Sequence, residues 1–198
     1  MLVTDRHATG GRDLLAVVQA ALAAGLPAVQ LRDKDLTGRA LWRLAEQLRL
    51  ATTATGAQFF VNDRVDIAVA VEADGVHLGE HSLPIAAARA LLAPAQRIGV
   101  STHAPAAPHA VGADYAFFGP VHATPSKDAF GPPQGWEALH AAVTATSIPV
   151  LAIGGLTPDD VVAVRRTGAH GLAVIRAVLA ADDPGTAVHD FLVALAAH

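Results

Sequence analysis

The stretch VLAIGGLTPDDVVAVRRTGAHGLAVIRA, residues 150–177, places a segment with helical spacing between two short apolar segments. The apolar segments Val150–Ile153 and Gly171–Ile175 have the length and the aliphatic composition of strands that are buried on both faces. Pro158–Thr167, between them, carries its apolar residues at helical spacing. A strand, a helix and a second strand in this order predict two parallel neighbouring strands joined by a right-handed crossover.

The same alternation recurs along the chain, with Gly or Pro at most junctions. The predicted strands are Leu2–Thr4, Ala28–Leu31, Phe59–Val61, Gly75–Leu78, Arg97–Val100, Tyr115–Phe118, Val150–Ile153 and Gly171–Ile175. The predicted helices are Asp13–Ala24, Gly38–Thr55, Val65–Val71, Pro84–Leu92, Pro105–Val111, Trp136–Thr146, Pro158–Thr167 and Gly185–Ala197. Eight such units favour one α/β domain over residues 1–198, a (β/α)8 TIM barrel of eight parallel strands ringed by helices. An open doubly wound sheet is the structural alternative.

The composition is that of a globular protein, because 52% of the 198 residues are hydrophobic and 16% are charged. Lys and Arg number 14 against 18 Asp and Glu, and no basic run occurs, so we expect no nucleic-acid partner. The absence of Cys excludes disulfides and thiolate metal sites. The opening MLVTDRH has no signal-peptide pattern, and the apolar runs are shorter than the roughly 20 residues of a membrane span. We therefore expect a cytoplasmic protein with no membrane partner.

In a barrel of this kind, functional groups lie where strands end and the following loops begin. The corresponding segments are TDRHATGGR, LRDKDLTG, NDR, HLGEHSLP, STHAP, GPVHATPSKDAFGPPQG, IGGLTP and IRAVL. They hold nearly all the chemically interesting residues of the chain, whereas the opposite loops are short connectors such as AAGLP and EADG. We expect Ser101, in the fifth segment, to line the substrate site.

Two consecutive glycines, Gly154 and Gly155, follow the seventh predicted strand and precede a helix. Glycine lets backbone N–H groups approach an anion closely, and barrels often bind phosphate between the loops after strands seven and eight. Ile175 and Arg176 end the eighth strand, where a helix N-terminus and a guanidinium add further donors. We expect a phosphate site at these four residues. The alternative is that the glycines only form a turn and Arg176 is a surface residue.

The longest predicted loop covers residues 119–134, and loops of this length in a compact domain are usually functional or disordered. Thr124, Ser126 and Lys127 supply two hydroxyl groups and an ammonium group within four residues, which suits an anionic oxygen. We expect this loop to be a mobile anion clamp that closes over a bound substrate. The alternative is a solvated loop whose polarity is incidental.

A polar cluster, VQLRDKD, ends the second predicted strand. Gln30 and Arg32 lie on the same side of this strand because strand side chains alternate, and Lys34 follows just beyond. An arginine inside a barrel requires an anionic partner, since an unpaired buried charge is costly. The partner is either a substrate anion or a structural carboxylate.

Asn62 and Asp63 follow the third predicted strand and offer oxygen ligands. Mg²⁺ typically takes only one or two carboxylates together with substrate oxygens, so Asp63 is a candidate metal ligand. The alternative is that Asp63 caps the following helix.

Histidine is the usual proton carrier near neutral pH. Five of the ten histidines lie in or beside the candidate loops: His7, His77, His81, His103 and His122. Any single one of them is more often a hydrogen-bonded structural residue than a catalyst, and no zinc-ligand spacing occurs.

The motifs VQLRDK, FVNDRVDIA, ADGVHLG, GADYAFFGPVHATPSK and VLAIGGL…GAHGLAVIRA resemble, in order and spacing, those of the thiamine phosphate synthase/TenI family. The resemblance runs from about Leu2 to about Val178. It implies a (β/α)8 barrel that binds a thiazole phosphate. Synthases couple this substrate to a hydroxymethylpyrimidine diphosphate and release diphosphate with Mg²⁺. TenI-type members instead aromatise a thiazole carboxylate phosphate by moving a proton.

The resemblance also implies roles for the residues that match. Arg32 and Lys34 match the diphosphate-binding pair of the family, Asn62 matches a contact to the pyrimidine, and Asp63 matches a Mg²⁺ ligand.

A second set of matches concerns the thiazole phosphate side. Thr124, Ser126 and Lys127 match the loop that holds phosphate and diphosphate, and Gly154 and Gly155 match the thiazole-phosphate glycines.

Departures from the family pattern keep the activity open. Ser82 stands where synthases usually carry a second Mg²⁺ aspartate, which resembles the TenI type and leaves Glu80 as the carboxylate that would substitute. The loop keeps the synthase residue Pro120, where a TenI-type protein has a catalytic histidine. His122 and His103 are then the candidates for proton transfer.

The intact loop favours the synthase, with Arg32, Lys127 and Mg²⁺ on Asp63 drawing charge onto the leaving diphosphate. Arg176, where many relatives have a small serine, would add charge at the thiazole phosphate. The alternatives are a TenI-type thiazole tautomerase and a non-catalytic regulatory barrel that only binds a phosphate ligand. The expected partners are a small-molecule thiazole phosphate and a pyrimidine diphosphate, and the family makes a homodimer the expected assembly.

Overall fold

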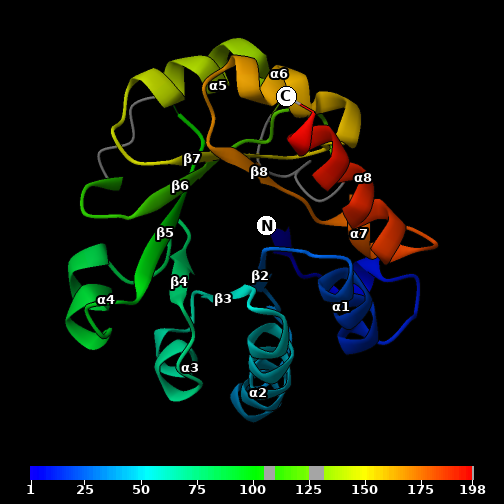
Figure 1. Cartoon of the computed structure of the whole chain (residues 1–198). Coiled ribbons are helices and arrows are strands. Elements are labelled where there is room, and N and C mark those ends of the chain that lie inside the picture. The colour runs from blue at the N-terminus through cyan, green and yellow to red at the C-terminus, as the bar shows by residue number, and fades with distance from the viewer. Residues whose placement is uncertain (105–109, 125–131, 198) are drawn as a thin grey trace.

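Eight parallel strands form one sheet that closes on itself (Figure 1). The computed structural model describes residues 1–104, 110–124 and 132–197. Neighbouring strands pair in chain order, from the first to the eighth. The last strand returns to the first, because the Val3 N–H donates to the Val174 carbonyl at 2.9 Å and the Val174 N–H donates to the Met1 carbonyl at 3.0 Å. The predicted (β/α)8 barrel is therefore confirmed, and the open sheet is excluded.

The strands agree with the sequence prediction to within about two residues. They are β1 (Leu2–Val3), β2 (Ala28–Leu31), β3 (Gln58–Asn62), β4 (Gly75–Leu78), β5 (Arg97–Thr102), β6 (Tyr115–Phe118), β7 (Val150–Ile153) and β8 (Gly171–Ala173). Most positions of these strands are buried, as the continuous apolar runs of the sequence indicate.

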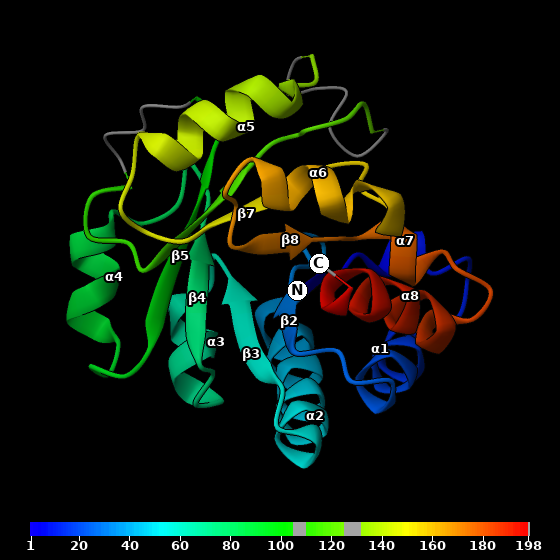
Figure 2. The same cartoon turned by 45° about the horizontal axis from the view of Figure 1, so that its top comes forward.

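The helices form an outer ring around the strands, with α6 lying across β7 and β8 (Figures 1 and 2). They are α1 (Leu14–Ala23), α2 (Gly38–Thr55), α3 (Val65–Ala70), α4 (Ile85–Leu91), α5 (Gly135–Thr144), α6 (Val161–Arg166), α7 (Arg176–Leu179) and α8 (Pro184–Ala196). Two 3-10 turns, η1 (Arg6–Ala8) and η4 (Pro158–Asp160), precede α1 and α6. Most of the predicted helix Pro105–Val111 lies outside the described residues.

The core has two layers, one between the strands and the helices and one inside the barrel. Strand β6 contributes to both, since Phe118 packs in the outer layer while Tyr115 and Phe117 fill the interior. The Tyr115 ring occupies space that only a glycine on the neighbouring strand leaves open. A Cβ atom on Gly99 would lie 2.0 Å from Cζ of Tyr115.

Carboxylates stabilise the end of the barrel at which the strands begin. The Oδ2 atom of Asp74 accepts a hydrogen bond from the Phe59 N–H at 2.7 Å and pairs with Arg49 at 2.8 Å. Asp114 repeats the arrangement with Arg89 at 2.5 Å and with a strand β5 N–H at 2.6 Å. Each carboxylate thus joins the start of a strand to a helix, and this end of the barrel is built for stability.

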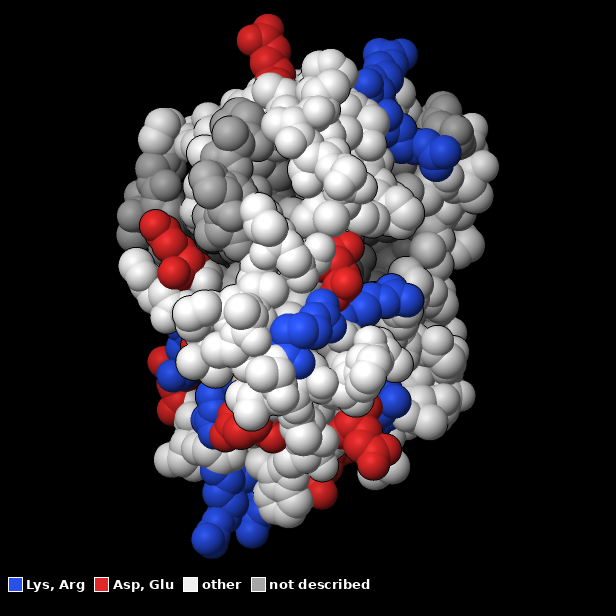
Figure 3. Space-filling model, turned by 90° about the vertical axis from the view of Figure 1, so that its left-hand side faces the viewer, with Lys and Arg blue, Asp and Glu red and all other residues white. Residues whose placement is uncertain are grey.

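The charged side chains on the face shown in Figure 3 are of both signs and interspersed among uncharged residues. Within the described ranges, no helix combines the length and the apolar composition that crossing a membrane requires.

Candidate active site

The candidate residues lie at the end of the barrel where the strands finish. Strand pairing sets Leu31 beside Val61 and Asn62 beside His77, so the residues that follow β2, β3 and β4 emerge at the same level. Because all eight strands are parallel, the loops after β6, β7 and β8 emerge at this same end. Residues far apart in the sequence therefore surround one barrel mouth.

A cavity of about 350 Å³ lies over β6, β7 and β8. All four residues of the predicted phosphate site line it, Gly154, Gly155, Ile175 and Arg176, together with Thr124 of the predicted clamp. Arg176 is the only charged side chain among its described lining residues, and it stands in the first turn of α7. The first N–H groups of a helix have no acceptor within the helix, so this wall offers donors together with a positive charge.

The two glycines are required by the loop that packs against them. Gly154 has φ +110°, and a Cβ atom there would lie 2.6 Å from Cα of Pro120. Gly155 has φ +67°, and its Cβ atom would lie 2.9 Å from Cβ of His122. The His122 N–H donates to the Gly154 carbonyl at 3.0 Å, which extends the pairing of β6 with β7 into the loops. The glycines thus form more than a turn, since they let two walls of the cavity meet.

A side-chain contact joins the same two loops. His122 Nε2 lies 3.0 Å from Oδ1 of Asp160, and Oδ2 of Asp160 accepts hydrogen bonds from the Thr157 N–H at 2.8 Å and from its hydroxyl at 3.0 Å. The His122 ring also meets the Trp136 ring edge-on, with 5.0 Å between the ring centres. Burial acts to raise the pKa of Asp160, but the hydrogen bonds from Thr157 and His122 outweigh it and hold that pKa below 3.8, its ordinary value.

Two predicted clamp residues, Ser126 and Lys127, lie outside the described residues, because residues 125–131 of the predicted mobile clamp are not described. Thr124 is described, is partly buried and lines the cavity. The near end of the loop is therefore placed at the candidate phosphate site.

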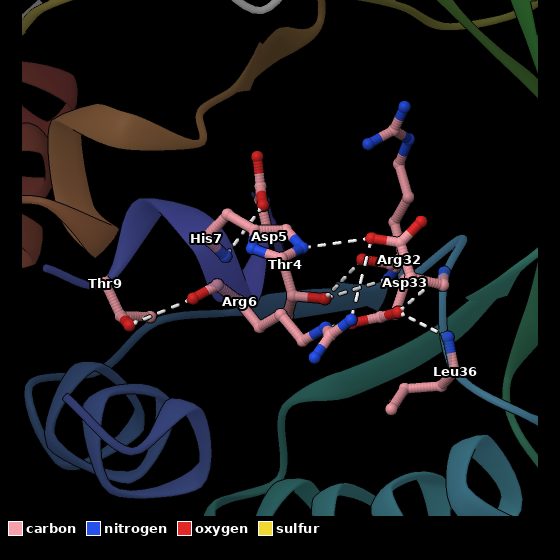
Figure 4. A network of polar contacts seen from close by, with 9 residues as sticks. Thr4, Asp5, Arg6, His7, Thr9, Arg32, Asp33 and Leu36 are labelled. Carbon is pink, nitrogen blue, oxygen red and sulfur yellow. Dashed lines mark hydrogen bonds and ion pairs between the residues drawn. The ribbon is translucent and has the colours of Figure 1, made fainter. Parts of the chain in front are cut away.

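The other half of the mouth carries Arg32 and Lys34, in the loop after β2. The hydroxyl of the fully buried Thr4 accepts a hydrogen bond from the Arg32 N–H at 2.9 Å and donates one to the Arg32 carbonyl at 3.2 Å. The Arg32 side chain points away from the contacts around it (Figure 4). Neither Arg32 nor Lys34 forms an ion pair with any residue in the described part of the chain. Both cations are thus available to an anionic ligand.

Asp33, between these two cations, faces the opposite way and fixes the loop. Its Oδ1 atom accepts hydrogen bonds from the N–H groups of Asp35 and Leu36, both at 3.0 Å. Its Oδ2 atom lies 2.8 Å from Nε of Arg6, an ion-pair distance, although the angle is too poor for a well-aligned hydrogen bond. His7 hydrogen-bonds Asp35 at 3.0 Å, which holds the pKa of this exposed carboxyl below its ordinary value. Polar contacts therefore tie the loop after β1 to the loop after β2 (Figure 4).

Asn62 ends β3, and Asp63 follows it in the left-handed backbone region with φ +66°. Aspartate tolerates this conformation better than most residues. The turn is held by the Asp63 N–H, which donates to the His77 carbonyl at 2.8 Å. Asp63 is exposed, and α3 has Arg64 at its N-cap with no side-chain cap. The alternative prediction, that Asp63 caps this helix, is wrong.

Glu80 and Ser82 lie in the loop after β4, next to the loop that carries Asp63. Glu80 is exposed, whereas the Ser82 hydroxyl accepts a hydrogen bond from the Gly79 N–H at 2.7 Å and so closes the loop on itself. No group of three or more His, Cys, Asp or Glu side chains suited to a metal occurs among residues 1–104, 110–124 and 132–197. A metal at this rim would therefore rely on Asp63, on Glu80 in the loop after the neighbouring strand, and on oxygen atoms of a ligand.

Polar side chains also line the barrel interior below the mouth. The buried His77 lies 3.2 Å from the Tyr115 hydroxyl through Nδ1 and 2.9 Å from the Ser101 hydroxyl through Nε2. Burial raises the pKa of the Tyr115 phenol. The nearby Gln30 amide offsets this in part, although its Nε2 makes no well-aligned hydrogen bond to the described residues. These side chains form a hydrogen-bonded network in the barrel interior below the mouth. His103, at the rim, has Nδ1 2.6 Å from the Gly119 carbonyl.

Sequence reasoning missed several residues that shape the site. Asp33 carried no signal beyond its place between two cations, and Thr4 and Tyr115 carried none, because their partners lie on other strands. Asp160 had a signal, since the sequence TPDD, with Asp three residues after Thr157, is close to a helix-capping pattern.

The family model described as thiamine monophosphate synthase matches residues 1–178 of the chain. A Geobacter sulfurreducens protein, to which the name thiamine-phosphate synthase is given provisionally, is 51% identical over 186 residues, which is 92% of this chain and 87% of that protein. The thiamine-phosphate synthase of Roseiflexus castenholzii is 45% identical over 189 residues, which is 94% of this chain and 83% of that protein.

A solved structure gives the same result. The thiamine phosphate pyrophosphorylase of Pyrococcus furiosus superposes with a TM-score of 0.88 at 36% identity, and the match covers 99% of this chain and 94% of that one. The fold and the sequence therefore match over nearly the whole length.

Proposed function

The chain belongs to the thiamine monophosphate synthase family, and on that basis we propose that it couples a hydroxymethylpyrimidine diphosphate to a hydroxyethylthiazole phosphate and releases diphosphate. The members named thiamine-phosphate synthase are transferases, and this chain is an enzyme of their kind.

One observation supports the choice of a coupling reaction: groups suited to binding anions stand at two separate places on the barrel mouth. The cavity over β6, β7 and β8 has the glycine pair and Arg176. Arg32 and Lys34 follow β2, on the other half of the mouth. A reaction between a phosphate ester and a diphosphate ester needs two such places, whereas a proton shift on one phosphate ester needs only the first.

The chemistry follows from these positions. Arg32 and Lys34 bind the diphosphate and stabilise the charge that grows on it as the bond between its oxygen and the pyrimidine methylene breaks. The bonding electrons leave with the diphosphate, and the methylene carbon becomes cationic. The thiazole nitrogen, held by the phosphate in the cavity, then donates its lone pair to this carbon. No proton has to move, so no histidine is needed for this step.

Asp63 fits a magnesium ion in this scheme. Mg²⁺ takes one or two carboxylates and fills its remaining positions with substrate and water oxygens. Asp63 is exposed at the rim, and its side chain has no hydrogen-bond partner among the described residues. When bound, the ion adds positive charge at the leaving diphosphate. Ser82, already bonded to Gly79, leaves Glu80 as the second carboxylate in this loop.

A TenI-type tautomerase is the second candidate, and the contact between His122 and Asp160 favours it. A histidine oriented by a carboxylate beside a phosphate cavity is a suitable proton carrier. In that case the second anion place at Arg32 would have no substrate to bind. A barrel that binds the phosphate without turnover is the third candidate.

The discriminating experiment incubates the purified protein with both substrates and Mg²⁺ and measures thiamine phosphate by chromatography. We expect thiamine phosphate and diphosphate in equal amounts. Aromatisation of a thiazole carboxylate phosphate without Mg²⁺, and no coupling, would support the tautomerase. Binding of the thiazole phosphate without either product would support the non-catalytic barrel.

We also propose that the enzyme works in the cytoplasm as a homodimer. The cysteine-free sequence suits a reducing compartment, and family resemblance supports the dimer. Light scattering on the purified protein measures the mass directly, and a mass of one chain would contradict the dimer.

A further inference from the structure

The ion pair between Arg6 and Asp33 lies on the opposite side of the β2–α2 loop from the Arg32 guanidinium (Figure 4). The Asp33 side chain is only 2% exposed, and both of its oxygen atoms are in use. One oxygen accepts two backbone hydrogen bonds, and the other faces the Arg6 guanidinium at 2.8 Å. The carboxylate therefore carries its negative charge inside the protein, where charges interact more strongly than in water.

This carboxylate stands between two cations in the sequence Arg32-Asp33-Lys34. A buried carboxylate without a counter-ion attracts any cation that can reach it. In the structure neither Arg32 nor Lys34 pairs with it, and the cation that does comes from the loop after β1. Arg6 also forms a longer ion pair with Asp35, at 3.6 Å, but Asp35 is exposed and is hydrogen-bonded to His7, so Asp33 is the buried partner of Arg6.

We propose that Arg6 is a positioning residue for diphosphate binding: by pairing with Asp33, it keeps that carboxylate from capturing Arg32 and Lys34, so that both cations face the ligand. This inference rests on the proposed function, in which Arg32 and Lys34 bind the diphosphate. It assigns a role to a residue that does not itself touch the substrate.

The test measures the affinity for inorganic diphosphate with Mg²⁺ by isothermal titration calorimetry. In Arg6→Gln, the Asp33 charge loses its partner and competes for Arg32 and Lys34. We expect the affinity to fall about tenfold, which corresponds to a loss of about 1.4 kcal/mol in binding free energy. The KM for the pyrimidine diphosphate should rise by a similar factor, while the KM for the thiazole phosphate stays at the wild-type value.

A second substitution separates charge competition from loss of structure. Asp33→Asn keeps an oxygen that accepts the two backbone hydrogen bonds but removes the negative charge. In the double variant Arg6→Gln with Asp33→Asn, we therefore expect the affinity to return to within about threefold of wild type, a difference of less than 1 kcal/mol by the relation between affinity and free energy. A purely structural role for Arg6 predicts that the double variant binds as weakly as Arg6→Gln.

Arg49→Gln is the matched control, because Arg49 pairs with Asp74 at the same 2.8 Å at the opposite end of the barrel. It should alter stability without changing diphosphate affinity. If Arg6→Gln does not fold, Arg6→Lys keeps the positive charge beside Asp33, and its affinity should stay within about threefold of wild type. A larger loss in a folded Arg6→Lys would overturn the inference.

The outcomes separate this inference from the proposed function. If the wild-type protein forms thiamine phosphate but Arg6→Gln binds diphosphate with the same affinity as the wild type, that result would overturn the inference alone. A double variant as weak as Arg6→Gln would do the same. A wild-type protein that does not bind diphosphate at all would overturn the proposed function and this inference with it.

Discussion

Gly154 shows how a single residue sets the shape of the cavity. Its φ of +110° disfavours any side chain, and the space for a Cβ atom is taken by Cα of Pro120 at 2.6 Å. We expect Gly154→Ala to lower the free energy of unfolding by about 3 kcal/mol, since backbone strain and overpacking each cost roughly 1–3 kcal/mol. It should also weaken binding of the thiazole phosphate, because the two walls of the cavity must move apart.

The control is Gly56→Ala. Gly56 also has a positive φ, +73°, but a Cβ atom there meets nothing within 4 Å. Only the cost of backbone strain remains, so urea denaturation should show the free energy of unfolding lowered by about 1 kcal/mol. Equal decreases in the free energy of unfolding in the two variants would mean that the contact with Pro120 does not exclude a side chain at position 154.

Arg176 is the next residue whose role is testable. Its guanidinium is the only charged group among the described residues that line the cavity. We expect Arg176→Gln to raise the KM for the thiazole phosphate about tenfold, because one charge-assisted hydrogen bond to phosphate is lost. Steady-state kinetics would measure this. The control is Arg165→Gln. The Arg165 guanidinium does not line the cavity and donates a hydrogen bond to the Leu195 carbonyl at 3.0 Å, so this substitution should leave the KM unchanged.

Asp160 gives a pH-dependent prediction. Its pKa in the folded protein lies below the ordinary 3.8, so its hydrogen bonds stabilise the fold above that pH, and this contribution is lost as the pH falls through the lowered value. Asp160→Asn lacks the titrating group. We expect the stability difference between wild type and variant to shrink as the pH falls from about 5 to about 2, as followed by urea denaturation. A difference that is constant over this range would contradict the lowered pKa.

Which residues the sequence reveals depends on whether their partners are local. Gly154, Gly155 and Arg176 stood out because adjacent residues mark a turn and a strand end. The pairs Arg6–Asp33 and His122–Asp160 did not, because their partners lie 27 and 38 positions apart and meet only once the barrel closes.

At the level of helices and strands, the pattern of apolar residues was sufficient to predict most of the strands. The strands buried on both faces are continuous apolar runs, and glycine or proline marks their ends, so β2, β4, β6 and β7 match their predicted bounds. The third and fifth strands are longer than predicted. Asn62 and Thr102 at their ends are polar, and polar residues at strand ends resemble loops.

The carboxylates that connect helices to the starts of strands give a further prediction. Asp74 ties Arg49 of α2 to the start of β3 through one oxygen atom. We expect Asp74→Ala to lower the free energy of unfolding by about 2 kcal/mol, within the range for hydrogen bonds to charged groups. Activity measured well below the melting temperature should not change, since this joint lies at the end of the barrel away from the candidate site. A raised KM would show that the two ends are coupled.

For the molecule as a whole, parallel topology makes the function possible. Eight parallel strands bring all their finishing ends to one rim, so residues from Arg32 to Arg176 meet without any local signal between them. The sequence predicts this convergence once the alternation of strand and helix is recognised. The separation of the candidate anion-binding residues into two sets, Arg32 and Lys34 after β2 and the glycine pair with Arg176 after β7 and β8, was predicted from local motifs and the resemblance to the family and does not follow from the alternation alone.

The most direct measurement is a crystal structure of the protein with thiamine phosphate, diphosphate and Mg²⁺. We expect the phosphate of thiamine phosphate in the cavity against Gly154, Gly155 and Arg176, and the diphosphate against Arg32 and Lys34 with the ion beside Asp63. A phosphate or diphosphate bound at the opposite end of the barrel, or both bound in the same cavity, would contradict the account.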